Sequence, residues 1–192
     1  MPETNLLLPP RADSLARFRE DFGQRFIVTV DTEEEFDWNA PLDRNRHGTQ
    51  STPALQTFQS FCEEFGVVPI YLVDYPVADS PLAAAAIGEA VAAGRAEIGV
   101  QLHPWVNPPY DEAVTPYNSY AGNLDFDLER EKFARLYHKI IAAFGTAPRI
   151  YRAGRYGLGR RTAEILTEFD VAIDTSVRAR FDYSASGGPN YR

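Results

Sequence analysis

Cysteine and long hydrophobic runs are both scarce in this sequence. Cys62 is the only cysteine of 192 residues, which excludes an internal disulfide framework. We expect its thiol to pack inside an amphipathic helix rather than to act as a nucleophile. The first ten residues contain three consecutive leucines and no basic stretch. An apolar run of three residues is too short for a signal peptide or a membrane span. We therefore expect a cytoplasmic protein.

Basic residues are also fewer than acidic ones. The chain has 19 Lys and Arg against 27 Asp and Glu, which gives a formal net charge of −8 at pH 7. Nucleic acids and anionic membrane surfaces both select clustered basic residues, so the balance argues against either as a partner. Hydrophobic residues at 44% and charged residues at 24% are typical of a soluble globular domain.

Turn and capping signals divide the chain into alternating strands and helices. The expected strands are 26–30, 67–73, 97–102, 149–151 and 171–173, and the expected helices are 52–66, 80–94, 127–144 and 161–169. The first strand, Phe26 to Val30, has the composition of a strand that is buried on both faces. The alternation predicts an α/β fold with a parallel sheet, either a (β/α) barrel or an open doubly wound sheet.

The expected domain covers residues 26–192 and follows an N-terminal extension, residues 1–25, with a short helix over 14–21. Two long segments, 32–51 and 104–123, lack periodicity but are rich in aromatic residues and proline, so we expect them to form ordered walls of a pocket. A closed barrel needs more than five strands. We therefore expect the chain to be incomplete at its C-terminus.

Polar residues follow four of the predicted strands directly. They are Asp31 after the first, His103 after the third, Arg152 and Arg155 after the fourth, and Asp174 after the fifth. Parallel strands place such residues on one edge of the sheet, which predicts a common site. A carboxylate at the rim of an apolar strand needs a partner. Asp31 is either bonded to the backbone of a turn or is a general base aimed by Arg152.

An acidic run follows the first strand. Glu33 lies two residues beyond Asp31 and is the leading carboxylate ligand for a metal, whereas Glu34 and Glu35 are expected to be solvated. Gln101 alternates onto the same face of its strand as the histidine at 103. One histidine with one or two carboxylates is a small ligand set, because transition-metal sites usually supply three protein ligands.

These segments resemble, in order, four motifs of the polysaccharide deacetylases of the NodB-homology type, most closely the WalW-type proteins. The similar segments are 29–33 to the T-F-D-D-G motif, 97–103 to the E-I-G stretch before metal-binding histidines, 151–157 to R-x-P-x-Y, and 174–176 to the fourth motif. Thr32 replaces the second aspartate of the first motif, and Gln101 stands near the position of a second histidine. The fifth motif, with its late histidine, has no counterpart before Arg192.

The resemblance implies an incomplete barrel and a hydrolase that removes an acetyl group from an N-acetylated or O-acetylated saccharide in polysaccharide or lipopolysaccharide metabolism. It implies that Asp31 is the base oriented by Arg152, and that Glu33 and His103 bind a divalent metal, zinc or similar. The residues expected to contact the carbohydrate are Gln101, Trp105, Arg155, Tyr156, Asp174 and Trp38. Two alternatives stay open: a catalytically impaired carbohydrate-binding protein, and a hydrolase of a non-sugar amide or cyclic ureide.

Overall fold

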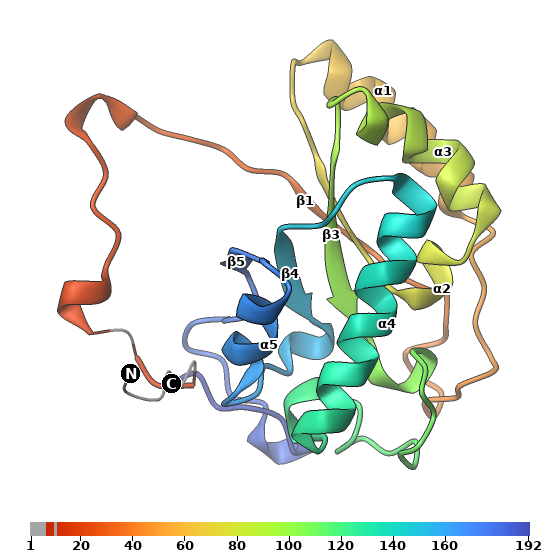
Figure 1. The fold of residues 1–192 in the computed structure, drawn as a ribbon, viewed down its shortest axis with the longest axis vertical. Helices are drawn as coiled ribbons and strands as arrows, with labels where there is room; N and C mark the ends of the chain where they lie inside the picture. The colour runs from red at the N-terminus through yellow and green to blue at the C-terminus, as the bar shows by residue number, and fades with distance from the viewer. Residues whose placement is uncertain (1–6, 10) are drawn as a thin grey trace.

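A sheet of five parallel strands forms the centre of the molecule (Figure 1). The computed structural model describes residues 7–9 and 11–192. The strands are β1 Thr29–Thr32, β2 Ile70–Val73, β3 Glu97–Leu102, β4 Ile150–Ala153 and β5 Ile173–Asp174. The helices are α1 Leu55–Glu64, α2 Tyr75–Ala78, α3 Pro81–Ala92, α4 Phe126–Phe144 and α5 Thr162–Glu168. The predicted α/β fold with a parallel sheet is confirmed.

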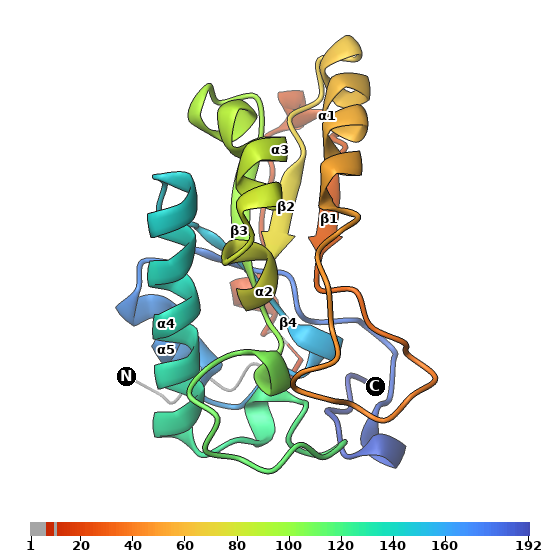
Figure 2. The same ribbon diagram turned by 90° about the vertical axis from the view of Figure 1, so that its right-hand side faces the viewer.

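The strand order, β1-β2-β3-β4-β5, follows the chain without a reversal. The larger helices cover one face of the sheet, as the two views together show (Figures 1 and 2). A doubly wound sheet would reverse its strand order and place helices on both faces, so the structure is wound in one direction only. Within the described residues the sheet stays open, with β1 and β5 at its edges.

Local sequence signals set most helix boundaries. Pro81 occupies the first turn of α3, where its missing N–H costs nothing. Gly145 follows α4 with φ of 69°, the left-handed conformation that commonly ends a helix. Along α4, Phe133, Leu136 and Ile140 are buried at a helical spacing and form part of the hydrophobic core beneath the sheet.

Two expectations at the N-terminal end are wrong. The helix expected over residues 14–21 does not form; one-turn 3-10 helices at Ala12–Ser14 and Glu20–Phe22 bracket an extended stretch. Residues 11–27 are all exposed, and a short helix without packing is unstable in water. The first strand is also not buried on both faces. Phe26 is 89% exposed, and β1 begins only at Thr29, at an edge of the sheet.

The two long segments, 32–51 and 104–123, lie at the carboxyl edge of the sheet (Figure 2). Arg44 of the first segment donates from Nε to the carbonyl of Trp105 at 3.3 Å and from Nη2 to the carbonyl of Glu112 at 3.0 Å. The segments therefore support one another beside the strand ends. Among the described residues, none of the helices combines the length and apolar character that crossing a membrane requires.

Candidate active site

Asp31 and Arg152 form an ion pair between Oδ1 and Nη1. Arg152 also donates from Nη2 to Thr29 Oγ1 at 3.1 Å and from Nε to Thr175 Oγ1 at 3.2 Å. Asp31 lies on β1 and Arg152 on β4, and in a flat sheet these strands would be about 14 Å apart, beyond the reach of an arginine. The sheet must therefore curl, and the pair spans its concave face.

Gly99 makes room for the filling of this concave face. A Cβ atom at Gly99 would lie 2.5 Å from Leu72 Cδ2 and 3.0 Å from the carbonyl oxygen of Ile150. Leu72 pairs in register with both Asp31 and Gly99, so all three residues are on the same face of the sheet. The fully buried Leu72 thus packs beneath the ion pair in space that a larger residue at position 99 would occupy.

His103 follows β3 and is buried, with its Nδ1 atom 2.7 Å from Oε2 of Glu34. Asp74 lies behind this contact: its Oδ2 accepts the Glu34 backbone N–H at 2.8 Å, and its Oδ1 accepts the Val77 N–H at 3.0 Å at the start of α2. The expectation that Glu34 is solvated is wrong, because only 3% of the residue is exposed. The chain turns inward after β1 and carries this carboxylate to the imidazole.

Charge and burial compete within this cluster. Burial pushes the pKa of Glu34 up, but the charge of His103 and several hydrogen bonds outweigh it and lower that pKa to about 2. Burial likewise pushes the pKa of His103 down, but the charges of Glu34 and Glu33 and the hydrogen bond to Glu34 hold it well above its usual value. Burial, helped by the charge of Glu34, raises the pKa of Asp74. The imidazole thus occupies an electronegative environment that favours a bound proton or a metal cation.

The other nitrogen of His103, Nε2, faces the second carboxylate. It lies 3.3 Å from Oε2 of Glu33 but makes no hydrogen bond to any described residue. Gln101 donates from Nε2 to the same Glu33 oxygen at 3.0 Å, and its own buried Oε1 atom has no partner among the described residues. An imidazole nitrogen without a hydrogen bond thus faces a carboxylate, and an amide oxygen without a partner lies on the side chain that binds the same carboxylate. This donor set fits a divalent cation.

A second group could also hold a metal ion. One ligand atom each from Glu34, Asp74 and His103 lies within 4.8 Å of the others, and all three residues are buried. Glu34 Oε2 and both Asp74 oxygens, however, already accept hydrogen bonds from the imidazole and from backbone N–H groups, which leaves only Glu34 Oε1 without a partner among the described residues. A carboxylate on the far nitrogen of a ligating histidine fixes its ring and tautomer. We therefore assign Glu34 and Asp74 to the support of His103.

Sequence reasoning missed Asp74, although a signal existed. Asp74 directly follows β2, in the same relation to its strand as His103 has to β3. Each of the first three strands therefore brings a site residue to the carboxyl edge of the sheet. Of these residues, sequence reasoning did not identify the one that follows β2.

The ring of Trp105 covers the imidazole, and further aromatic rings pack outside it. Trp105 stacks on His103 with centroids 4.5 Å apart and ring planes at 21°, and a Cβ atom at Gly154 would lie 2.3 Å from His103 Cδ2 on the ring. Phe36 meets Trp105 edge-on at 5.7 Å and contacts Trp38 at 4.3 Å. Trp105 is buried and Trp38 is 57% exposed, so only the outer tryptophan offers a free ring face to a ligand.

No protein-family model matches the chain, and no curated protein matches it. Solved structures do show likeness. A Mycobacterium smegmatis protein named as a polysaccharide deacetylase has 21% identity and a TM-score of 0.48 over 66% of this chain and 39% of its own. The BpsB deacetylase domain of Bordetella bronchiseptica has 16% identity and a TM-score of 0.48 over 68% of this chain and 61% of its own.

A mutant of a CE4 family pseudoenzyme with restored enzymatic activity has 12% identity and a TM-score of 0.47, over 78% of this chain and 43% of its own. The chain thus spans 39% to 61% of the length of these three structures. Likenesses this distant do not assign the chain to a family. Its chemistry has to be argued from its own residues.

Arg155 binds the long segment 104–123. Its Nη1 atom donates to Ser119 Oγ and, at 3.4 Å, to the carbonyl of Pro116, and its guanidinium lies 4.3 Å from the Tyr120 ring centroid. Arg155 has φ of 54°, and Tyr156 has φ of 60°. Two successive non-glycine residues in this region carry backbone strain, which is commonly retained near functional sites. The role of Arg155 as a carbohydrate contact stays a prediction.

Tyr156 and Asp174 lie on the same side as the C-terminal segment. The Tyr156 ring stacks on Tyr183 with centroids 6.1 Å apart, and its carbonyl accepts the Tyr191 hydroxyl at 2.5 Å. Asp174 Oδ1 accepts the backbone N–H of Ser176 at 3.1 Å, and burial raises the pKa of Asp174. Both residues are engaged in internal contacts, and their predicted contacts with carbohydrate remain untested.

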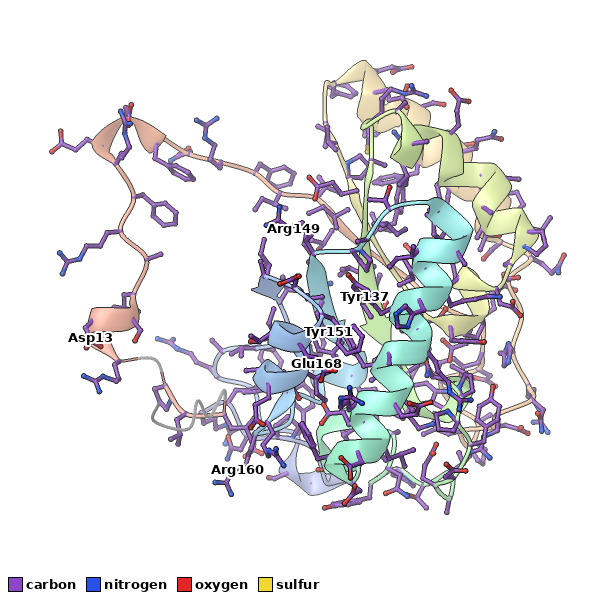
Figure 3. The ribbon with its side chains drawn as sticks, viewed as in Figure 1. Asp13, Tyr137, Arg149, Tyr151, Arg160 and Glu168 are labelled. Carbon is purple, nitrogen blue, oxygen red and sulfur yellow. The ribbon has the colours of Figure 1, made fainter. Side chains whose placement is uncertain are left out.

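Two clefts lie away from these residues. One, of about 670 Å³, is lined by residues that include Tyr137 and Arg149, both labelled in Figure 3. The other, of about 540 Å³, lies along α4 and includes Tyr75 and His138. Neither cleft contains a residue of the candidate site.

Proposed function

We propose that this chain is a polysaccharide deacetylase-like hydrolase that removes an acetyl group from an N-acetylated saccharide, or an O-acetylated one. One juxtaposition carries the proposal: Asp31, paired with Arg152, is two residues before Glu33, which directly follows β1 and faces the Nε2 atom of His103. The order of the four motif-like segments in the sequence supports the same reading.

A divalent cation on Glu33 and His103 Nε2, zinc or similar, would polarise the acyl oxygen and acidify the attacking water. Asp31 accepts the proton of that water as general base. Arg152 orients this carboxylate through the Nη1 contact. The burial of Glu34 against Nδ1 holds Nε2 toward the front of the site.

The carbohydrate would lie over the carboxyl edge of the sheet. Trp38, the exposed ring of the aromatic group, is proposed to stack on a sugar ring, with Trp105 and Tyr156 as walls. Gln101 sits at the proposed cation and would contact the acyl group. Further polar contacts are proposed for Arg155 and Asp174.

The substitution Asp31→Asn tests this proposal. Asparagine keeps an oxygen for Arg152 but cannot take a proton at neutral pH, so acetate release from N-acetylated oligosaccharides should fall by about 10²-fold or more. Zinc content and the thermal unfolding midpoint should match those of the parent protein. Asp37→Asn, at an exposed position of the same acidic run, serves as the control and should retain full turnover. Undiminished acetate release by the Asp31 variant would remove the assignment of the base.

One contact favours a second candidate function, carbohydrate binding without catalysis. The Gln101 amide already donates to the Glu33 carboxylate, which could satisfy that oxygen without a cation. Metal analysis of the purified protein, an acetate-release assay and titration with glycans separate the two functions. Glycan binding with neither metal nor acetate release would favour the second.

A further inference from the structure

Lys132 of α4 has a fully buried ammonium group that is aimed at the chain segment after His103. Its Nζ atom donates to the carbonyls of Pro104 at 3.0 Å, Asn107 at 2.6 Å and Pro109 at 2.5 Å. All three donors of the ammonium are thereby used on one short segment, residues 104–112, which we name the wall segment.

The burial of this lysine is compensated by a matched set of acceptors. Glu112 at the end of the wall segment lies 3.0 Å from Nζ, with 6% of its side chain exposed. Burial lowers the pKa of Lys132, and an unpaired charge in such a place would be strongly unfavourable. Three carbonyls and one carboxylate from a single segment converge on the ammonium, so the contact fixes the path of that backbone.

Arg44 of the first long segment also holds the wall segment. Besides its bonds to the carbonyls of Trp105 and Glu112, its guanidinium carbon lies 4.5 Å from the ring centroid of Tyr110. Residues of α4 and of the first long segment therefore both bind the wall segment. Within the part of the chain that the structure describes, neither cation forms a hydrogen bond or ion pair with His103, Glu33 or Glu34.

The wall segment carries the ring that lies on the imidazole. Lys132 binds the carbonyls at positions 104 and 107, which flank Trp105 on both sides in the chain. Trp105 in turn stacks on His103, and the backbone at Gly154 lies close to the Cδ2 atom of the same ring. A shift of this backbone would displace the indole and free the imidazole to rotate.

We infer that Lys132 is a positioning residue: by fixing the backbone around Trp105 it holds the indole against His103 and so sets the direction of the imidazole Nε2. Its effect on turnover rests on the proposed function. The placement of Trp105 does not, and can be measured separately.

Trp105 itself supplies the measurement. The chain has two tryptophans, so a Trp38→Phe background leaves Trp105 as the sole fluorophore. In that background Lys132→Met should shift the emission to longer wavelength and raise acrylamide quenching several-fold. Lys139→Met, on the same helix but paired with Asp79 at the surface, is the matched control and should change neither. Parent-like emission and quenching in the Lys132 variant would overturn the inference.

A double variant separates positioning from simple charge balance. In Lys132→Met with Glu112→Gln, no carboxylate is left behind and the amide oxygen can still accept from Arg44, yet the three carbonyls still lack their donor. We expect Trp105 to stay exposed in this protein; a return to parent-like emission would mean that Lys132 only neutralises Glu112, and the inference would be wrong.

Two further measurements complete the experiment. If the methionine variants do not fold, Lys132→Gln replaces them. Its single amide group can donate to only some of the carbonyls, so acrylamide quenching of Trp105 should rise above that of the parent. Parent-like quenching would again overturn the inference. Acetate release, assayed with Trp38 in place, should fall in the Lys132 variants and not in Lys139→Met. A shifted Trp105 signal in a protein whose parent releases no acetate would refute the proposed function and leave the inference standing.

Discussion

Glu129 provides a quantitative test of the packing of α4 against the start of α5. This carboxyl group is 4% exposed, and its Oε1 atom accepts the Thr162 hydroxyl at 2.6 Å. Burial raises the pKa of Glu129 from 4.5 to about 7, against the smaller opposing effect of that hydrogen bond. The folded protein therefore keeps this group protonated at pH values where the unfolded chain has already released the proton.

The sign and size of the effect on stability follow from this difference. Below pH 4.5 the group is protonated in both states, and its contribution to stability is fully present. As the pH rises from 4.5 through about 7, the unfolded state gains from ionisation and the folded state does not. At about 1.4 kcal/mol per pKa unit, the free energy of unfolding should fall by about 3 kcal/mol over this range.

The perturbation is Glu129→Gln, which keeps an acceptor for Thr162 and cannot ionise. Urea unfolding of both proteins should give a difference in free energy that moves by about 3 kcal/mol in favour of the variant between pH 4.5 and pH 7 and then levels off. Glu164→Gln is a control of opposite sign, because a hydrogen bond from Arg161 lowers the pKa of Glu164. A Glu129 difference that is independent of pH would refute the reasoning.

Two further substitutions probe the sheet and the candidate site. Gly99→Ala should destabilise the fold by about 1–3 kcal/mol in urea unfolding, because its methyl group overlaps Leu72. Gly88→Ala, in a helix with open space around it, should instead stabilise by about 0.5–1 kcal/mol, and equal losses at both positions would contradict the overlap. Glu34→Gln should weaken zinc binding about 10–100-fold in calorimetric titration, because it loosens the support of the imidazole. The exposed Glu35→Gln should not, and equal affinities would argue against that support.

Helix boundaries were predictable because their signals are local. Proline in the first turn of α3 and the left-handed glycine after α4 act through a few neighbouring residues, and both helices lie where those signals place them. The parallel order of strands followed from the alternation of elements. It brought Asp31 and Arg152 together, and the expected contact between them is present.

Burial of individual side chains was less accessible to sequence reasoning. Glu34 and Glu35 are identical neighbours in an acidic run, yet one is buried against His103 and the other is exposed. Nothing within the run distinguishes them, because the difference arises from the turn of the chain after β1 and from Asp74 on the next strand. The apolar residues at 26 and 27 failed as a strand for a similar reason: no neighbouring strand reaches them.

The contact between Arg152 and Asp31 has a mechanical consequence beyond its proposed chemistry. The contact joins the first strand to the fourth across the two strands between them, so it stabilises the curvature of the sheet. An edge strand with a hydrogen-bonded neighbour on only one side gains a second attachment in this way. Replacement of the Arg152 guanidinium should therefore change the curvature of the sheet as well as the environment of the Asp31 carboxylate.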